Sequence, residues 1–341
     1  MRQRTRQKQS QRPQRSKRLR RIMISIAAAF ALVLVGIGGI ALFGVQLTHS
    51  FDGQIEVLTD AEVFPDESTR PDASDRGELN ILVLASDSRG EVADVSDSEE
   101  STGQRSDVVM LVHIDAAREH VQVMSLMRDS WVDVPGHGPA KINAAMSWGG
   151  TPLAVQTVEA LLGVRIDHVA LIGFEGFEQM TDALGGVSVY VPAPFSEGGF
   201  TFEQGQTDMQ GEQALVFVRQ RYAFAAGDFQ RVKNQQAFIQ ALANRAISGG
   251  TLTSPTKMAA LVDAIARNLS VDRGFTSERM LEIGFSLGEI RPSNVSYFTV
   301  PASGTGMEGD QSVVYIDEAG LAALREALAN DTVDQFAGAR R

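Results

Sequence analysis

Two apolar stretches, NILVLA (80–85) and VVMLVHI (108–114), decide the fold of this chain. Apolar runs that lack polar alternation are typical of strands buried on both faces of a sheet. The same character recurs farther along the chain, in His120–Met127 and Val169–Gly173. We therefore expect at least four buried strands in a common sheet.

Helical patterns separate these strands. Pro152–Leu162 has a proline near its first turn, where proline is tolerated, and Gly176–Leu184 ends at Gly185-Gly186. Strands that alternate with helices predict an α/β domain with helices on both faces of the sheet. We expect this domain to begin near Leu79 and to extend to about residue 335.

Charge is distributed unevenly along the 341 residues. The net charge is −11, but residues 1–21 contain ten arginines and lysines and no acid. Removing those ten from the total of 31 leaves 21 basic and 42 acidic residues, so the remainder has a charge of −21. The chain has no cysteine, which excludes disulfides, thiolate catalysis and zinc–thiolate sites.

The basic segment directly precedes Ile22–Val45, which has 24 residues and no charge. As a helix it would be about 36 Å long, enough for a hydrocarbon core of about 30 Å. The positive-inside rule places residues 1–21 in the cytoplasm and the domain outside the cell membrane, after an extracytoplasmic linker at 46–78. The alternatives are a cleaved signal peptide, whose apolar core would be shorter, and a basic arm that binds DNA.

Two carboxylates follow or precede the first two strands. Asp87 comes directly after the first strand, and Asp107 stands before the second. If these strands are antiparallel neighbours, both side chains lie at the same edge of the sheet. Hard carboxylate oxygens suit Mg²⁺, and Mn²⁺ is also possible. The alternative is that each aspartate only caps a turn or a strand end.

Cations gather between residues 219 and 233 of this acidic domain. Arg219 and Arg221 would point to the same side if that stretch is extended. A helix is expected to open at Gly227-Asp228, and Asp228, Arg231 and Gln235 would then share the apolar side of the helix. Charged side chains on the side of a helix that faces the core must line a polar cleft, because burying a charge without a partner is energetically unfavourable. Guanidinium groups bind phosphate in a bidentate manner, although a structural Asp–Arg network is the alternative.

Three further residues have weaker signals. Arg128 follows a buried strand, and Lys141 follows the turn Pro135-Gly136-His137-Gly138. Cations that converge with carboxylates are suited to phosphoryl transfer, where the protein neutralises charge and positions the reactants. His113 lies inside a buried strand, and we interpret it as a core histidine.

The order and spacing of these motifs resemble the LytR-CpsA-Psr family. The resemblance rests on five segments: NILVLASDSRG (80–90), RSDVVMLVHI (105–114), SLMRDSWVDVPGHGPAKINAA (125–145), IDHVALIGFEGFEQMTDALGGV (166–187) and GEQALVFVRQRYAFAAGDFQRVKNQQAFI (211–239). It covers about residues 79–250 strongly and the remainder loosely. It implies a three-layer α/β/α sandwich with a mixed central sheet, preceded by one N-terminal transmembrane helix. Because the chain ends soon after Asn330, we expect the extra C-terminal domain of some members to be missing.

The resemblance also implies roles for individual residues. Asp87 and Asp107 would hold Mg²⁺, and Asp228 would orient the cations. Lys141 would lie near the pyrophosphate. The residues implied to line the pyrophosphate site of the lipid-linked donor are Arg89, Arg128, Arg219, Arg221, Arg231 and Gln235.

The implied activity is the transfer of a teichoic acid, capsule or arabinogalactan type of glycopolymer. The donor would be a polyprenyl pyrophosphate carrier, the acceptor would be peptidoglycan, and no nucleic acid would take part. A muramic acid hydroxyl would attack the proximal phosphorus and release polyprenyl phosphate. Two alternatives remain: an envelope pyrophosphatase that uses the same residues with water, and a non-catalytic membrane-bound regulator.

Overall fold

β2 (Leu79–Ser86) and β3 (Ser106–Ile114), the two strands that decide the fold, pair in antiparallel fashion within a seven-stranded sheet. The strand order is β1-β12-β7-β2-β3-β4-β13. The remaining strands are β1 (Glu56–Leu58), β4 (Val121–Leu126), β7 (His168–Gly173), β12 (Leu269–Asp272) and β13 (Val295–Thr299). Three pairs, β2–β7, β1–β12 and β4–β13, are parallel, so the sheet is mixed as expected.

The computed structural model describes residues 55–86, 106–221, 223–224, 227–248, 260, 263–264, 266–287 and 290–339, all within the unit Ser50–Arg341. The basic segment 1–21 and the expected membrane span 22–45 lie outside the described residues. Among the helices of the described part, none has the length and hydrophobicity that a membrane span requires.

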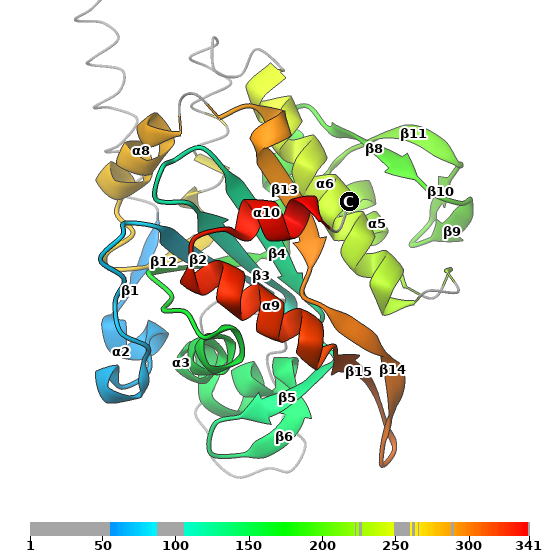
Figure 1. Ribbon diagram of the computed structural model, residues 1–341. Helices are drawn as coiled ribbons and strands as arrows, with labels where there is room; N and C mark the ends of the chain where they lie inside the picture. Colours follow the sequence, from blue (N-terminus) through cyan, green and yellow to red (C-terminus); the bar gives the residue numbers. More distant parts are fainter. Residues whose placement is uncertain are drawn as a thin grey trace, which may run out of the picture. The chain divides into compact units, whose positions relative to one another are not determined.

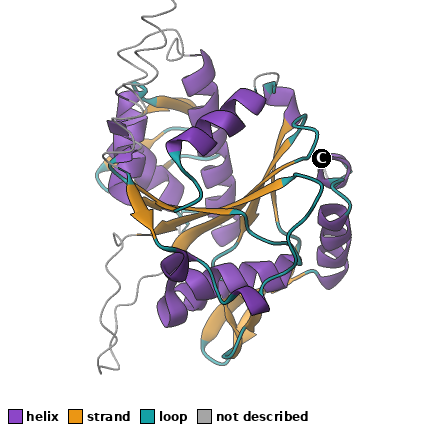
Figure 2. Ribbon diagram, turned by 90° about the vertical axis from the view of Figure 1, so that its left-hand side faces the viewer, coloured by secondary structure: helices purple, strands orange, loops and turns teal. Residues whose placement is uncertain are grey.

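Helices cover both faces of the sheet, as Figures 1 and 2 show. The helices of the described part are α2 (Asp60–Val63), α3 (Ile142–Leu162), α4 (Phe174–Ala183), α5 (Gly211–Arg219), α6 (Asp228–Ser248), α8 (Ser277–Ser286), α9 (Glu318–Ala329) and α10 (Val333–Gly338). Alternate residues of β2 point to opposite faces. Leu82 and Leu84 belong to the core that contains α3 and α9, whereas Ile81 packs in a cluster with Ile283 of α8. The structure therefore has the expected three layers.

α6 lies on the same face of the sheet as α8. The amide of Gln236 donates hydrogen bonds to Ser125 Oγ at 3.0 Å and Thr299 Oγ1 at 3.3 Å. Met124 and Leu126 belong to the core on the α3 side, so Ser125 between them must point the other way. This polar contact fixes α6 across the ends of β4 and β13.

A smaller four-stranded sheet follows directly from β4. Its order is β14-β15-β5-β6, formed by β5 (Ser130–Val134), β6 (Gly138–Lys141), β14 (Ala302–Glu308) and β15 (Gln311–Ile316). Two hairpins, β8 (Val187–Val191) with β11 (Gly205–Met209) and β9 (Phe195–Glu197) with β10 (Phe200–Phe202), pack with α5 and α6 in an aromatic-rich core.

α3 is longer than the helical pattern predicted, because it begins at Ile142 and not near Pro152. The helix is interrupted at Gly149 and Gly150, and Gly150 has φ 63° and ψ −157°, a conformation that only glycine adopts easily. The kink places Pro152 close to the start of the second half, where its missing N–H does no harm.

Residues 55–78, for which the sequence suggested a spacer, are part of the folded unit. β1 pairs with β12 at the edge of the large sheet. The buried Arg70 forms an ion pair with Glu159 of α3 at 2.7 Å and donates to the carbonyl of Ile166 at 2.5 Å. Its guanidinium group also lies 4.4 Å from the centre of the Phe64 ring. The local sequence could not predict this ion pair, because Arg70 and Glu159 are 89 residues apart.

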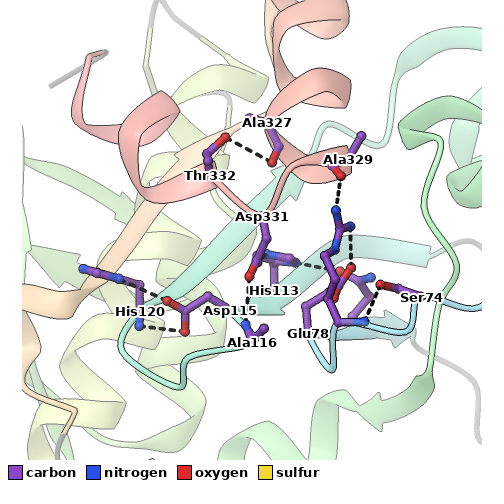
Figure 3. A network of polar contacts seen from close by, with 12 residues as sticks. Ser74, Glu78, His113, Asp115, Ala116, His120, Ala327, Ala329, Asp331 and Thr332 are labelled. Atoms are coloured by element: carbon purple, nitrogen blue, oxygen red, sulfur yellow. Dashed lines mark hydrogen bonds and ion pairs between the residues drawn. The ribbon is translucent and has the colours of Figure 1, made fainter.

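A polar network attaches the last helices to β3 (Figure 3). Asp331, between α9 and α10, lies 3.1 Å from Nε2 of His113 and accepts a hydrogen bond from the backbone N–H of Ala116 at 3.0 Å. Nδ1 of His113 lies 2.8 Å from Oδ1 of Asn80. Burial lowers the pKa of His113, and the nearby Asp331 charge opposes that effect only in part. The interpretation of His113 as a core histidine is confirmed.

We expect Glu159→Ala to destabilise the folded unit strongly. The side chains of Arg70 and Glu159 are 5% and 1% exposed, so the substitution leaves a buried guanidinium without its carboxylate. Removing one partner of a buried pair destabilises a protein by roughly 3–5 kcal/mol. Urea unfolding of the unit 50–341 would measure this change.

Glu282→Ala is the matched control. Glu282 pairs with Arg279 on α8, but its side chain is 67% exposed, so its loss should change the free energy of unfolding by about 1 kcal/mol or less. Similar effects of the two substitutions would contradict the role assigned to Arg70 and Glu159.

Candidate active site

The turn after β4 holds the first two residues of the site. Arg128 and Asp129 follow the buried Met127, which packs with Val232 of α6. The carbonyl of Arg128 accepts a hydrogen bond from the N–H of Asn143 at 3.2 Å, and that of Asp129 accepts one from Val314 at 2.8 Å. These main-chain bonds fix the turn between the start of α3 and β15.

Asp129 bridges two of the expected cations. Its carboxylate lies 3.3 Å from Nζ of Lys141 and 3.8 Å from Nε of Arg128. Lys141 ends β6 and occupies the N-cap position of α3. No role was predicted for Asp129 from the sequence, although it is an acid directly beside Arg128. The structure thus brings Arg128 and Lys141 together through a carboxylate.

The first turn of α6 supplies the second ion pair. Asp228 is the first residue of the helix, after Gly227 with φ 51°, and Arg231 lies one turn later. A guanidinium nitrogen of Arg231 is 2.5 Å from Asp228 Oδ1. This contact is an ion pair: neither oxygen of Asp228 accepts a hydrogen bond of good geometry within the described residues. Arg231 is only 5% exposed, whereas Lys233 is exposed, as the helix register predicts.

Gln235 has a structural contact in addition to its expected place in the site. Its amide nitrogen lies 3.5 Å from the carbonyl of Val218, and that of Asn234 lies 3.5 Å from the carbonyl of Phe217. Both carbonyls belong to the last turn of α5, and that of Phe217 also accepts a hydrogen bond from the N–H of Gln220 at 3.3 Å. α6 therefore caps α5 and holds the segment that follows it.

The stretch around Arg219 and Arg221 differs from the extended segment that their spacing suggested. Arg219 is the last residue of α5, and Gln220, its C-cap residue, has extended dihedrals, φ −68° and ψ 127°. The side chain of Gln220 is buried and donates to Glu197 at 3.3 Å. Arg219 is exposed and Arg221 is half-buried. Arg219 thus belongs to a helix, and the backbone becomes extended only from Gln220 onward.

Four charged side chains lie close enough to Asp228 to shift the pKa of its carboxyl. Burial raises the pKa of the Asp228 carboxyl, and the negative charge of Asp129 raises it further. The positive charges of Arg231, Arg128 and Arg221 act in the opposite direction. The turn after β4, the loop after α5 and the start of α6 therefore converge on one place.

Asp87 and Arg89 lie outside the described residues, as does the side chain of Asp107. The backbone register is informative, because Ser86 pairs with Ser106 whereas Ala85 pairs with Val108. Asp107 is therefore the extra, unpaired residue at an irregularity in β3. Its neighbour Ser106 pairs with Ser86, the last residue of β2, and Asp87 follows Ser86 in the sequence. The antiparallel pairing on which the shared-edge hypothesis depended is confirmed.

Carboxylate oxygens, such as those of Asp107 and of Asp87, which follows β2 in the sequence, are ligands that suit a hard divalent cation. Within the residues that the structure describes, no group of three or more acidic, histidine or cysteine side chains could hold a metal ion. The carboxylate of Asp129 pairs with Lys141, and that of Asp228 pairs with Arg231. Such basic side chains are suited to bind an anion and not a metal cation.

The cluster formed by Arg128, Asp129, Lys141, Arg221, Asp228 and Arg231 has four positive and two negative groups. Among these six described groups, the positive charges therefore outnumber the negative charges by two. Positioned guanidinium groups can bind phosphate oxygens and stabilise the charge that develops in phosphoryl transfer.

Comparisons with known proteins agree with this geometry. Residues 50–330 match the model of the LytR_cpsA_psr family. The cell wall biosynthesis protein LcpA of Corynebacterium glutamicum is 29% identical over 280 residues, which are 71% of this chain and 54% of LcpA. The polyisoprenyl-teichoic acid–peptidoglycan teichoic acid transferase TagU of Oceanobacillus iheyensis is 36% identical over 201 residues, 57% of this chain and 58% of that protein. The matches thus span little more than half of these two relatives.

Solved structures have the same fold. Bacillus subtilis TagV aligns with a TM-score of 0.62 at 24% identity, covering 76% of this chain and 98% of TagV. The structure of TagT bound to LI-WTA aligns with a TM-score of 0.60 at 22% identity, covering 79% of this chain and 99% of TagT. At this level of identity the likeness concerns the fold alone.

We expect Asp228→Asn to remove a pH-dependent part of the stability. A carboxyl whose pKa is raised in the folded state binds its proton more tightly there, so this part is fully present below about pH 3.9 and is lost as the pH rises through the folded pKa. Unfolding free energies of the parent and variant between pH 3 and 8 would measure it. Their difference, parent minus variant, should fall with rising pH; a rise would mean that the arginines outweigh burial.

Proposed function

The chain belongs to the LytR-CpsA-Psr family, and on that premise we propose that it joins a glycopolymer to peptidoglycan. In this proposal the donor is a polyprenyl pyrophosphate-linked polymer and the product is a phosphodiester. The observation that carries it is the convergence of four cations with two carboxylates at the end of β4 and the start of α6. The relatives named as teichoic acid transferases and as cell wall biosynthesis proteins support the substrate class.

The reaction we propose is attack by a peptidoglycan hydroxyl on the phosphorus that bears the glycan. One oxygen–phosphorus bond forms, the bond to the bridging oxygen breaks, and polyprenyl phosphate leaves. Arg128, Arg221 and Arg231 bind the non-bridging oxygens, because planar guanidinium groups make paired hydrogen bonds to phosphate. Arg219, which is exposed at the end of α5, and Lys141 bind the outer part of the pyrophosphate.

Asp228 has two roles in this proposal. Its ion pair keeps Arg231 at the first turn of α6. Its oxygens accept no well-formed hydrogen bond from the described residues, and burial raises its pKa, so it is suited to take the proton of the attacking hydroxyl. The same oxygens would orient that hydroxyl toward the phosphorus.

Asp87 and Asp107 would hold Mg²⁺ or Mn²⁺ at the neighbouring edge of the sheet, and Arg89 would lie beside them. A bound divalent ion would neutralise negative charge on the pyrophosphate. Residues 22–45 would anchor the chain in the cell membrane, with residues 1–21 inside and the catalytic domain outside. The uncharged 24-residue run after a basic segment supports this topology.

A transfer assay tests the proposal. The full chain in detergent, a synthetic polyprenyl pyrophosphate glycopolymer and purified peptidoglycan should give polymer that is covalently bound to the wall, together with polyprenyl phosphate. Omitting peptidoglycan should stop turnover. Equal release of free polymer phosphate with and without peptidoglycan would instead identify a pyrophosphatase.

Replacing either Asp87 or Asp107 by Ala should abolish the dependence of turnover on Mg²⁺ and lower the rate. The reason is that one carboxylate alone is a weak ligand for a hydrated divalent ion. Turnover and Mg²⁺ affinity would be measured on the same preparations, with Asp133→Ala on the exposed side of β5 as the control. Unchanged Mg²⁺ dependence in both variants would refute this metal site.

A further inference from the structure

α8 has an apolar side that faces solvent. Ile283 is buried against β2 and β3, whereas Leu281 is 44% exposed and Phe285 is 81% exposed. Leu281 and Phe285 are four residues apart, so they lie on the same side of the helix. Phe285 is the most exposed large hydrophobic residue in the described part of the chain. A single exposed apolar residue is ordinary, whereas neighbouring exposed apolar residues form a patch of the kind that interaction surfaces use.

β1 adds a third apolar side chain on the same face of the sheet. Leu58 packs in the core on the α3 side, so the preceding residue, Val57, points to the face that α8 covers. Val57 is 53% exposed. β1 pairs with β12, and only residues 273–276 separate β12 from α8. In Figure 1, β1, β12 and α8 lie on the same side of the sheet assembly.

The chain enters the folded unit at this place. The proposed membrane anchor ends at Val45, and β1 begins at Glu56, so ten residues connect them. Ten residues span at most about 36 Å when fully extended. If residues 22–45 span the membrane, β1 must therefore begin within about 36 Å of the end of that span.

We propose that the outward side of α8, formed by Leu281 and Phe285, contacts the lipid bilayer and holds the domain against it. This inference rests on the proposed anchor. Leucine and phenylalanine are the residues with which interfacial helices enter the boundary between headgroups and acyl chains. Two such side chains would bind a free protein weakly, but a short tether raises the effective concentration into the millimolar range.

Charge around the helix neither drives nor prevents this contact. Residues 273–291 contain three arginines and three glutamates, so their net charge is zero. On α8 itself, Arg279 pairs with Glu282 at 2.7 Å. The contact should therefore depend on apolar burial and should be insensitive to ionic strength.

The absence of cysteine from the chain allows a direct test. Gly284 lies beside the exposed pair on α8, and a Cβ added there meets no atom within 4 Å. A nitrobenzoxadiazole label on Gly284→Cys in the full chain would be reconstituted in phosphatidylcholine–phosphatidylglycerol vesicles that contain nitroxide-labelled lipids. The control label is Ser188→Cys on the exposed side of β8.

We expect at least threefold stronger quenching at position 284 than at position 188, unchanged between 50 and 500 mM salt. Leu281→Ser combined with Phe285→Ser should reduce the quenching at 284 to the control level. Equal quenching at the two positions, or quenching that survives the double substitution, would refute the contact. The label at position 284 would also be measured in detergent, without a bilayer. If its exposure to a water-soluble quencher decreases as the protein concentration rises, a second copy of the chain covers this face, and the bilayer contact is refuted.

Vesicle flotation separates this proposal from the anchor on which it rests. The parent and the double-substituted chain should float equally, because residues 22–45 hold both. A chain that does not float would refute the anchor, and the bilayer contact with it. A floating chain with an unquenched label at 284 would refute the bilayer contact alone.

Discussion

The ion pair between Asp228 and Arg231 is the interaction on which the site depends. Both groups are largely buried at the first turn of α6, and burial of a charge is unfavourable unless an opposite charge or a ligand compensates for it. The charges of Arg128, Arg221 and Asp129 also act on Asp228. Among the described groups of this cluster, the positive charges are in excess. A pyrophosphate group is the kind of ligand that this excess suits.

The fold explains how cations from distant parts of the sequence reach this place. Only residues 127–129 separate β4 from β5 of the smaller sheet, and this turn contains Arg128 and Asp129. α6 is fixed on the end of β4 through Gln236, and it caps α5 through Asn234 and Gln235. The two sheets and two helices thus position side chains that are about 100 residues apart in the sequence.

Much of this arrangement could be predicted from local patterns. β2 and β3 were recognisable because both faces of each strand are buried, and the register of α6 followed from its periodicity. The helix end at Arg219 was not predictable, because it depends on capping by α6. The bridge from Asp129 to Lys141 and the pair of Arg70 with Glu159 were also beyond the sequence, since both are contacts between segments that meet only in the folded chain. Composition alone made residues 55–78 look like a spacer.

The central claim is that positioned cations, and not bulk positive charge, bind the donor. Arg231 and Lys233 provide the direct comparison, because each contributes one positive charge to the same helix, one buried and one exposed. Calorimetric titration of the full chain in detergent with inorganic pyrophosphate would measure the affinities of Arg231→Ala and Lys233→Ala. A hydrogen bond to a charged group contributes about 1.5–3 kcal/mol, so Arg231→Ala should weaken binding by roughly 10- to 150-fold. Lys233→Ala should change it less than about twofold, and equal losses from the two substitutions would contradict the account.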